Sequence, residues 1–575
     1  TPNHSMTTKM APVVSEVIDK IEEFSCQGLS NTGRTPSKME QRVESAMMGA
    51  CGACPRRLSE ESTVQNASNI AWELATPGVR GEPPFGRIVA AAARPTCELG
   101  DRDIAAFAWR LAATSSTSAS AIGCASCSGR PCLSSQHVAT RSLANIAWGL
   151  GNWSAGGKAS LHAAAEQAVA ETSEDIRCQT ATASSVATFA SLADVITNLN
   201  AIAWALNFMG FLTDELDRAM YSLVATAAEM RDRLMKHDLT APLLALRLVS
   251  RPEASTIPGP LVSTPTPRIV VDLPEMCVVH KPPDWEVDCV DVGSGFLLST
   301  YLQCRFSLSE APLVHLEEHQ FGMVHRLDRV SSGLLLVGKT FVGFNCAKWQ
   351  LNTGQLQREY VVLVHGWVPL DLRFIDAKVL HVHAQGGKES SVTEQGKPSQ
   401  TRLTTLGHYT LQRHSSSRVG GDEAEERVEE FQDDEHGEVE SFSLVVIQIC
   451  TGRRHQIRTH LAHVGYPTVT DGKYATTKAQ FVRDKRWCPR NFLHRYRLGF
   501  CDSRSVPHEA VAPLPEDLAS AATQLRPRES ASGCALAEWL LGQMQPRPWA
   551  TYRPLALAPS VEGLPASRSS DLAGS

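Results

Sequence analysis

The chain has 575 residues, of which 43% are hydrophobic and 20% charged, a composition that excludes fibrous and fully disordered proteins. Its length predicts about two or three folded units, and none of its apolar runs approaches the ~20 residues of a membrane span. The net charge of −6 is uneven, because residues 418–440 hold eleven acidic residues and two arginines, which leaves +3 for the rest. Charge alone therefore neither supports nor excludes a nucleic-acid partner.

Residues 1–60 form a poorly defined N-terminal segment that begins at Thr1 and mixes acidic residues with lysines, unlike an acid-poor transit peptide. The compartment stays open between cytoplasm, mitochondrion and chloroplast. Sixteen cysteines without a dense, regular framework favour free thiols in a reducing compartment. Cys124, Cys127, Cys132 and His137 have a compact spacing compatible with zinc, although their order is not that of a standard zinc knuckle.

A helical phrase recurs within residues 61–245, around Trp72, Trp109, Trp148 and Trp204. The tryptophans are 37, 39 and 56 residues apart, and apolar residues recur five before, two before and two after each one. This spacing places one apolar stripe on each helix and predicts an all-α solenoid of stacked repeats. The phrase resembles octotricopeptide RNA-binding repeats, and an ordinary helical bundle with core tryptophans is the alternative.

Residues 246–268 are rich in proline, serine and threonine and predict an extended linker. Beyond it, short β-branched runs bounded by turn residues predict an α+β domain over residues 269–520. The acidic run 418–440 separates two strand-like segments and predicts a solvated hairpin insertion in this domain. Residues 521–575 are expected to form a C-terminal tail.

The strongest local signal is FGMVHRLDRVSSGLLLVGKT, in which a tight turn between two strands carries Asp328. HRLD followed by SGLLLV resembles the catalytic motif of RluA-type pseudouridine synthases, in which the aspartate is the nucleophile. The segments VVHKPPDWEV, REYVVLVHG, CTGRRHQIRTHLAHVGYP, TDGKYA and FLHRYRLGF resemble further motifs of that family, in the same order. Three positions depart from the family pattern, namely Val330, Ser331 and Thr470, the last standing where a glycine is expected.

The resemblance implies a pseudouridine synthase fold, with a mixed, largely antiparallel sheet and a central RNA cleft. It implies that Arg458 pairs with Asp328 and lowers its pKa, that Tyr360 stacks on the uracil and helps to remove the C5 proton, and that Ile457 walls the pocket. It also implies that Arg326 enters the base stack when the target uridine flips out.

The remaining expected base-pocket and RNA-binding residues are His325, Leu327, Lys281, Arg453 and Arg454, and Arg358 is a further candidate for phosphate contacts. Structural alternatives stay open: Asp328 as a turn residue that caps its own backbone, Arg458 as a surface arginine, and the other basic residues as solvated surface.

The predicted activity is isomerisation of specific uridines in rRNA or tRNA, by a monomer that uses no metal or other cofactor and binds no membrane. The alternative is an inactive RNA-binding or ribosome-assembly factor that keeps the fold. Because a linker precedes it, the piece 262–575 is expected to fold alone and to keep its activity, while the repeats recruit RNA.

Overall fold

The computed structural model describes part of residues 162–176 and the segments 186–237, 265–287, 296–384, 387–393, 396–412 and 439–542. The repeat copies around Trp72, Trp109 and Trp148, the candidate zinc ligands and most of the acidic insertion lie outside these residues.

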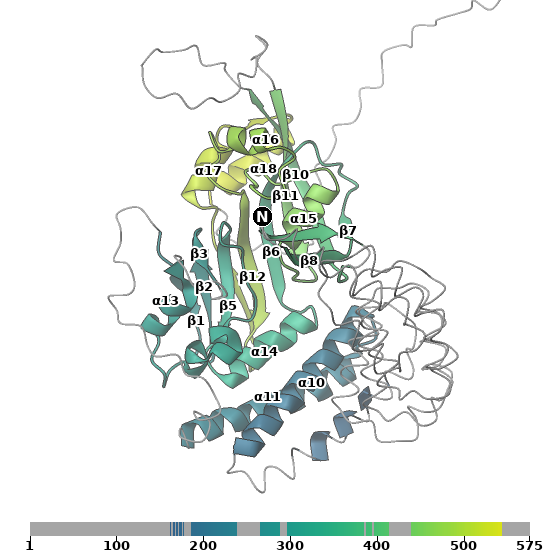
Figure 1. The fold of residues 1–575 in the computed structure, drawn as a ribbon, viewed down its shortest axis with the longest axis vertical. Coiled ribbons are helices and arrows are strands. Elements are labelled where there is room, and N and C mark those ends of the chain that lie inside the picture. Colours follow the sequence, from purple (N-terminus) through teal and green to yellow (C-terminus); the bar gives the residue numbers. More distant parts are fainter. Residues whose placement is uncertain are drawn as a thin grey trace, which may run out of the picture.

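A ten-stranded, largely antiparallel sheet forms the centre of the described C-terminal half (Figure 1). Its main path runs β1 (Arg268–Asp272), β2 (Met276–Lys281), β5 (Ser332–Gly338), β12 (Leu493–Cys501), β6 (Gln357–His365), β11 (Val439–Ile449), β10 (Gln400–Gln412) and β14 (Arg526–Pro527). β13 (Pro507–Val511) pairs with β12, and β7 (Phe374–Asp376) pairs with β10. The pairing of β5 with β12 is parallel. The mixed, largely antiparallel sheet expected from the sequence is therefore confirmed.

Two short sheets flank the main one, formed by β3 (Trp285–Glu286) with β4 (Phe296–Leu297) and by β8 (Val379–Ala384) with β9 (Gly387–Val392). The described helices of this half are α13 (Leu298–Arg305), η4 (Pro312–His315), η5 (Glu317–Gly322), α14 (Phe341–Asn352), α15 (Gln456–His463), α16 (Lys478–Asp484), α17 (Glu516–Ala522) and α18 (Ser530–Leu540). β10 and β11 pair along their whole length, so the acidic insertion joins neighbouring strands as expected.

The alternation of side chains along each strand gives the sheet two different faces. On one face, Val278 and Leu336 pack with helix α14, and Val361 and Val446 pack in the cluster that includes residues of α17 and α18. Tyr360 belongs to the core cluster of the opposite face. Residues of α18, among them Trp539, are buried, so the folded part extends beyond residue 520, where the sequence suggested a tail.

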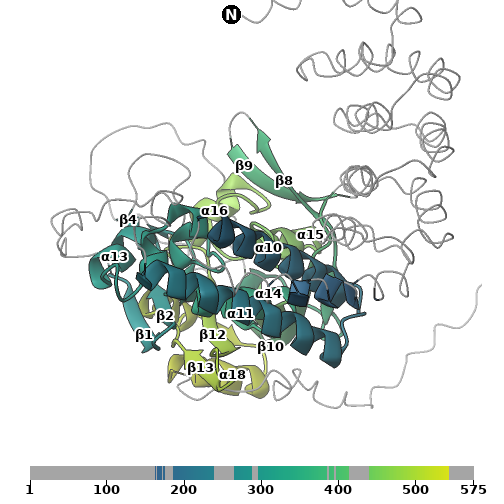
Figure 2. The ribbon, with the colours of Figure 1, turned by 90° about the horizontal axis from the view of Figure 1, so that it is seen from below.

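Helices α10 (Val186–Phe208) and α11 (Asp214–His237) lie side by side against α14 (Figures 1 and 2). α10 carries the last copy of the helical phrase, and its stripe residues Leu199, Ile202 and Leu206 are fully buried. This copy forms a helix whose stripe is buried, but α10 is apolar on most of its surface rather than amphipathic, and the solenoid as a whole stays a prediction.

One window of α10, Thr188–Phe208, is long and apolar enough to cross a membrane by length and composition, a property that the sequence analysis missed. Half of that window is buried inside the structure, against α11 and α14, which is how a core helix behaves.

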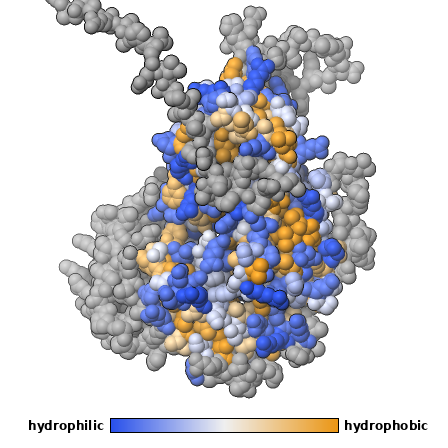
Figure 3. Space-filling view, turned by 180° about the vertical axis from the view of Figure 1, so that it is seen from behind, coloured by the Kyte–Doolittle hydropathy of each residue, from blue (hydrophilic) through white to orange (hydrophobic). Residues whose placement is uncertain are grey.

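The described surface carries hydrophobic areas bordered by hydrophilic residues on the face shown in Figure 3.

Candidate active site

Asp328 lies on the turn between η5 and β5 and lines a pocket. The backbone N–H of Ser331 donates to the carbonyl of Asp328 at 3.0 Å, which closes the turn. The carbonyl of Arg329 accepts from the N–H of Asp284 at 2.8 Å and from Lys281 Nζ at 3.2 Å. The turn therefore keeps its hydrogen bonds although Val330 and Ser331 depart from the family pattern. The side chain of Asp328 is 18% exposed.

Arg458 on α15 pairs with this carboxylate, since its Nη1 lies 2.9 Å from Asp328 Oδ2. Burial by itself raises the pKa of Asp328, but the charge of Arg458, together with smaller effects of His455 and Arg326, outweighs it. The pKa of Asp328 therefore lies below its ordinary value, and the group is ionised at neutral pH.

Asp471 holds Arg458 from the other side, although the sequence analysis gave it no role. Its carboxylate accepts from Arg458 Nε at 2.7 Å and Nη2 at 2.6 Å, and also from the hydroxyl of Thr468 and the backbone N–H groups of Lys473 and Tyr474. Asp471 is fully buried, so the guanidinium is fixed between two carboxylates. Asp471 could have been found from the sequence, because it is the acid of TDGKYA, one of the segments that resemble motifs of the family.

Thr470, directly before Asp471, has a φ of +55°, in the left-handed region that glycine adopts at no cost. A β-branched residue is strained there. Two buried hydrogen bonds hold it, because its N–H donates to Asp484 at 3.0 Å and its hydroxyl donates to the Cys488 carbonyl at 2.9 Å. This backbone conformation explains why a glycine was expected at the position.

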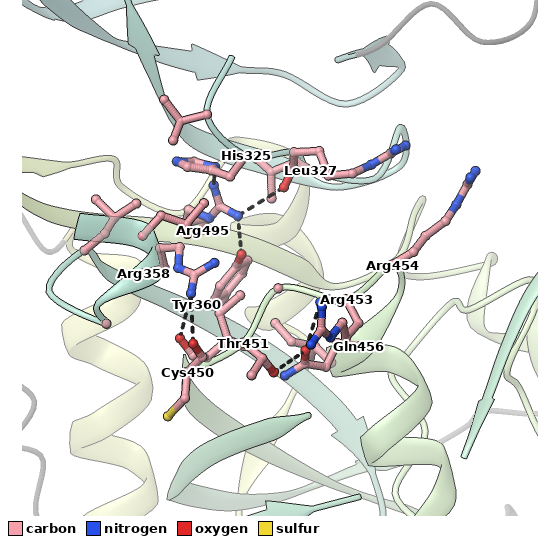
Figure 4. Close-up of a pocket in the computed structure, with 18 of the residues that line it drawn as sticks. His325, Leu327, Arg358, Tyr360, Cys450, Thr451, Arg453, Arg454, Gln456 and Arg495 are labelled. Carbon is pink, nitrogen blue, oxygen red and sulfur yellow. Dashed lines mark hydrogen bonds between the residues drawn. The ribbon is translucent and has the colours of Figure 1, made fainter. Parts of the chain in front are cut away.

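Tyr360 on β6 lies on the pocket floor and is 3% exposed. Arg495 from β12 donates a hydrogen bond to its hydroxyl and lies over its ring at 4.8 Å (Figure 4). The same guanidinium donates to His325 Nδ1 at 2.6 Å and to the Arg326 carbonyl at 3.2 Å. Arg495 therefore ties Tyr360 to the turn that carries Asp328. Arg495 stands in the segment FLHRYRLGF, whose sequence alone did not indicate this role.

The pocket has a volume of about 900 Å³. Eight cationic side chains line it: Arg326, Lys348, Arg358, Arg402, Arg453, Arg454, Arg458 and Arg495. The acidic residues of its lining are Glu317 and Asp328. Such a positive cavity suits a polyanion whose phosphates spread over its rim.

The other expected pocket residues fall into two groups. Leu327 and Ile457 are buried in the wall, and Arg326, two residues before Asp328, is exposed. Arg453 lines the pocket and donates to the Pro398 carbonyl at 3.3 Å, while the side chain of Arg454 points away from the floor in Figure 4.

Lys281 and Arg358 do not have the surface position that phosphate contacts require. The ammonium of Lys281 is fully buried and donates to the carbonyls of Pro282, Trp285 and Arg329 at 2.8, 2.9 and 3.2 Å, and burial lowers its pKa to about 7. Its bond to the Arg329 carbonyl supports the turn that carries Asp328. Arg358 is 3% exposed and donates to the carbonyls of Ile449 and Cys450.

The histidines near the site are hydrogen-bonded within the fold. Burial, opposed by the charge of Asp328, lowers the pKa of His455 to about 4, and its Nδ1 lies 2.9 Å from the Tyr474 hydroxyl. Burial and the charge of Arg495 lower the pKa of His325 far below its ordinary value. Among the residues that the structure describes, the group close enough to hold a metal ion is His365, Glu440 and Asp484, and none of these lines the pocket.

Comparison with known proteins finds similarity over the same segment: residues 275–463 match the family model for RNA pseudouridylate synthase. The chain is 32% identical over 206 residues to the uncharacterized RNA pseudouridine synthase YlyB of Bacillus subtilis, covering 36% of this chain and 56% of that one. It is 28% identical over 221 residues to ribosomal large subunit pseudouridine synthase C of Haemophilus influenzae, covering 38% and 59%. To synthase D of Neisseria meningitidis it is 28% identical over 257 residues, covering 44% and 56%. The chain thus spans just over half the length of these relatives.

Proposed function

We propose that this chain is an RNA pseudouridine synthase that isomerises specific uridines in rRNA or tRNA, with Asp328 as its catalytic nucleophile. The observation that carries the proposal is the carboxylate of Asp328, hydrogen-bonded to Arg458, in the lining of a cationic pocket that also contains Tyr360. The match of residues 275–463 to the RNA pseudouridylate synthase family supports the same reaction.

The reaction breaks the bond between uracil N1 and ribose C1′ and forms a bond between C5 and C1′. C5 loses a proton and N1 gains one, so no electrons are exchanged with an outside partner. Such an isomerisation needs a negative group to trap or stabilise the reacting carbon and a group to move the proton. Asp328 supplies the first, whether it attacks C1′, attacks the base or stabilises charge while a glycal forms.

Tyr360 is the group that we assign to the proton. Arg495 covers its ring and donates to its hydroxyl, so a cation faces the oxygen that, as a phenolate, would take up the proton that C5 loses and become a phenol. Arg326 is exposed, lines the pocket and lies two residues before Asp328, so it is suited to fill the space of a flipped base.

The proposal is tested with RNA labelled with tritium at uridine C5, because pseudouridine formation releases that hydrogen. Wild-type protein should release tritium, and Asp328→Asn should release none while its affinity for RNA stays within a few-fold of wild type. Asp371→Asn, an exposed aspartate outside the pocket, is the matched control and should behave as wild type.

A second measurement maps pseudouridines across all RNAs with and without the protein, which also identifies the substrate. Tritium release by Asp328→Asn near the wild-type rate would refute the role of Asp328. Tight RNA binding with no pseudouridine change at any site would support the inactive RNA-binding factor instead.

A further inference from the structure

Two aromatic side chains of helix α10, Trp204 and Phe208, line the same pocket as Asp328 although they come from outside the segment that matches the synthase family. They are one helical turn apart, and their rings stack with centroids 5.6 Å apart and an interplanar angle of 17°. Both are only half-buried. The neighbouring stripe residues Leu199, Ile202 and Leu206 are fully buried in the core, so the helix turns one face inward and presents this aromatic pair to the pocket.

The aromatic pair is held rigidly against the described C-terminal half, residues 265–542, which carries Asp328 and is called the catalytic half below. Asn207, between the two rings in sequence, donates to the Asn352 carbonyl at 3.3 Å, and Asn352 donates to the side-chain oxygen of Asn200 at 2.8 Å. Phe189 at the other end of α10 contacts Phe341 of α14 edge to face, with ring centroids 5.5 Å apart. A platform fixed at both ends loses little conformational freedom when a ligand stacks on it.

A cation of the catalytic half lies beside the pair, and a second lines the same pocket. The guanidinium of Arg453 lies over the Trp204 ring at 5.9 Å, within the range of a cation–π contact. Lys348, on α14, lines the pocket as well. Half-buried aromatic rings next to basic side chains are the combination with which proteins bind single-stranded nucleic acid, the rings stacking on bases and the cations meeting phosphates.

We infer that Trp204 and Phe208 form a stacking subsite for a nucleobase that flanks the target uridine, so that α10 takes part in choosing the RNA site. The inference rests on the proposed function, because it names a contact with the same RNA. In this arrangement the last helical phrase, on α10, lies at the pocket and contacts an unpaired base next to the reactive nucleotide.

The test measures RNA binding by Asp328→Asn protein, so that turnover is not needed and the outcome is separate from that of the catalytic proposal. Trp204→Ala should raise the apparent Kd roughly tenfold, as loss of one base–aromatic stack does, while Trp204→Phe should restore most of the affinity. In the active protein, Trp204→Ala should raise KM and leave kcat nearly unchanged. Trp367→Ala, an exposed tryptophan that does not line the pocket, is the matched control and should bind as the parent does.

A substrate series then separates a direct contact from a folding defect. RNAs that carry an abasic site at each position within four nucleotides of the target uridine are bound to parent and Trp204→Ala protein. At one position the abasic RNA should reproduce the tenfold loss with the parent and add nothing with Trp204→Ala. Unchanged binding by Trp204→Ala, or losses that add at every position, would overturn the subsite.

Discussion

Replacing Asp471 by Asn should impair catalysis more than binding, because it loosens Arg458 without touching the RNA. The wild-type carboxylate receives two bonds from that guanidinium, at 2.7 and 2.6 Å. A hydrogen bond to a charged group contributes about 1.5–3 kcal/mol, and Asn keeps one acceptor oxygen while its NH₂ faces the donors of Arg458. We therefore expect a loss of about 2–4 kcal/mol in stability. A displacement of the guanidinium by about 1 Å costs ~100-fold in rate.

The assay compares tritium release under single turnover at saturating RNA with the melting temperature of each variant. Glu359→Gln is the matched control, because Glu359 is another fully buried carboxylate, paired with Arg497 and outside the pocket lining. It should lower the melting temperature by a similar amount and leave the saturating rate within a few-fold of wild type. An Asp471→Asn protein that is destabilised but turns over at the wild-type rate would refute the positioning role.

Two further predictions concern the same site. Arg458→Gln removes the charge that lowers the pKa of Asp328 and leaves the burial that raises it, so the acid limb of the kcat profile should move to higher pH; an unshifted limb in a folded variant would contradict the pairing. Gly333→Ala should strongly reduce both the melting temperature and turnover, because a Cβ there would lie 2.3 Å from the backbone oxygen of Arg495; a normal melting temperature would show that the β5–β12 pairing can yield.

The local features of the catalytic half were predictable from the sequence, because strands and turns are encoded within a few residues. The run MCVVHK forms β2, and the run around Tyr360 forms β6. The pairing of Arg458 with Asp328 was also expected, since both stand in motifs with a known order.

Contacts between distant segments were not predictable in the same way. Arg495 reaches Tyr360 across 135 residues of sequence, and nothing near Arg495 indicates which hydroxyl it meets. Lys281 resembles a surface cation until the fold places three carbonyls around its ammonium. Burial of this kind is a property of the assembled tertiary structure.

The linker before residue 269 suggested that the piece 262–575 folds by itself, yet the structure predicts that this piece is destabilised. α10 and α11 share one hydrophobic core with α14, and Asp232 of α11 accepts from the N–H groups of Phe341 and Val342 at 2.9 and 3.0 Å. Those N–H groups lie at the start of α14, so removing their acceptor resembles the loss of a helix cap, which costs about 0.5–2 kcal/mol. Phe341 and Trp349 would also become exposed to solvent.

Asp232→Ala in the full chain isolates this contact, with Glu229→Ala, an exposed residue of the same helix, as its control. We expect Asp232→Ala to lower the melting temperature of the catalytic half, the control to leave it unchanged, and the piece 262–575 to melt lower than either. If that piece melted with the full chain and kept its saturating rate, α10 and α11 would be bound to the catalytic half without stabilising it.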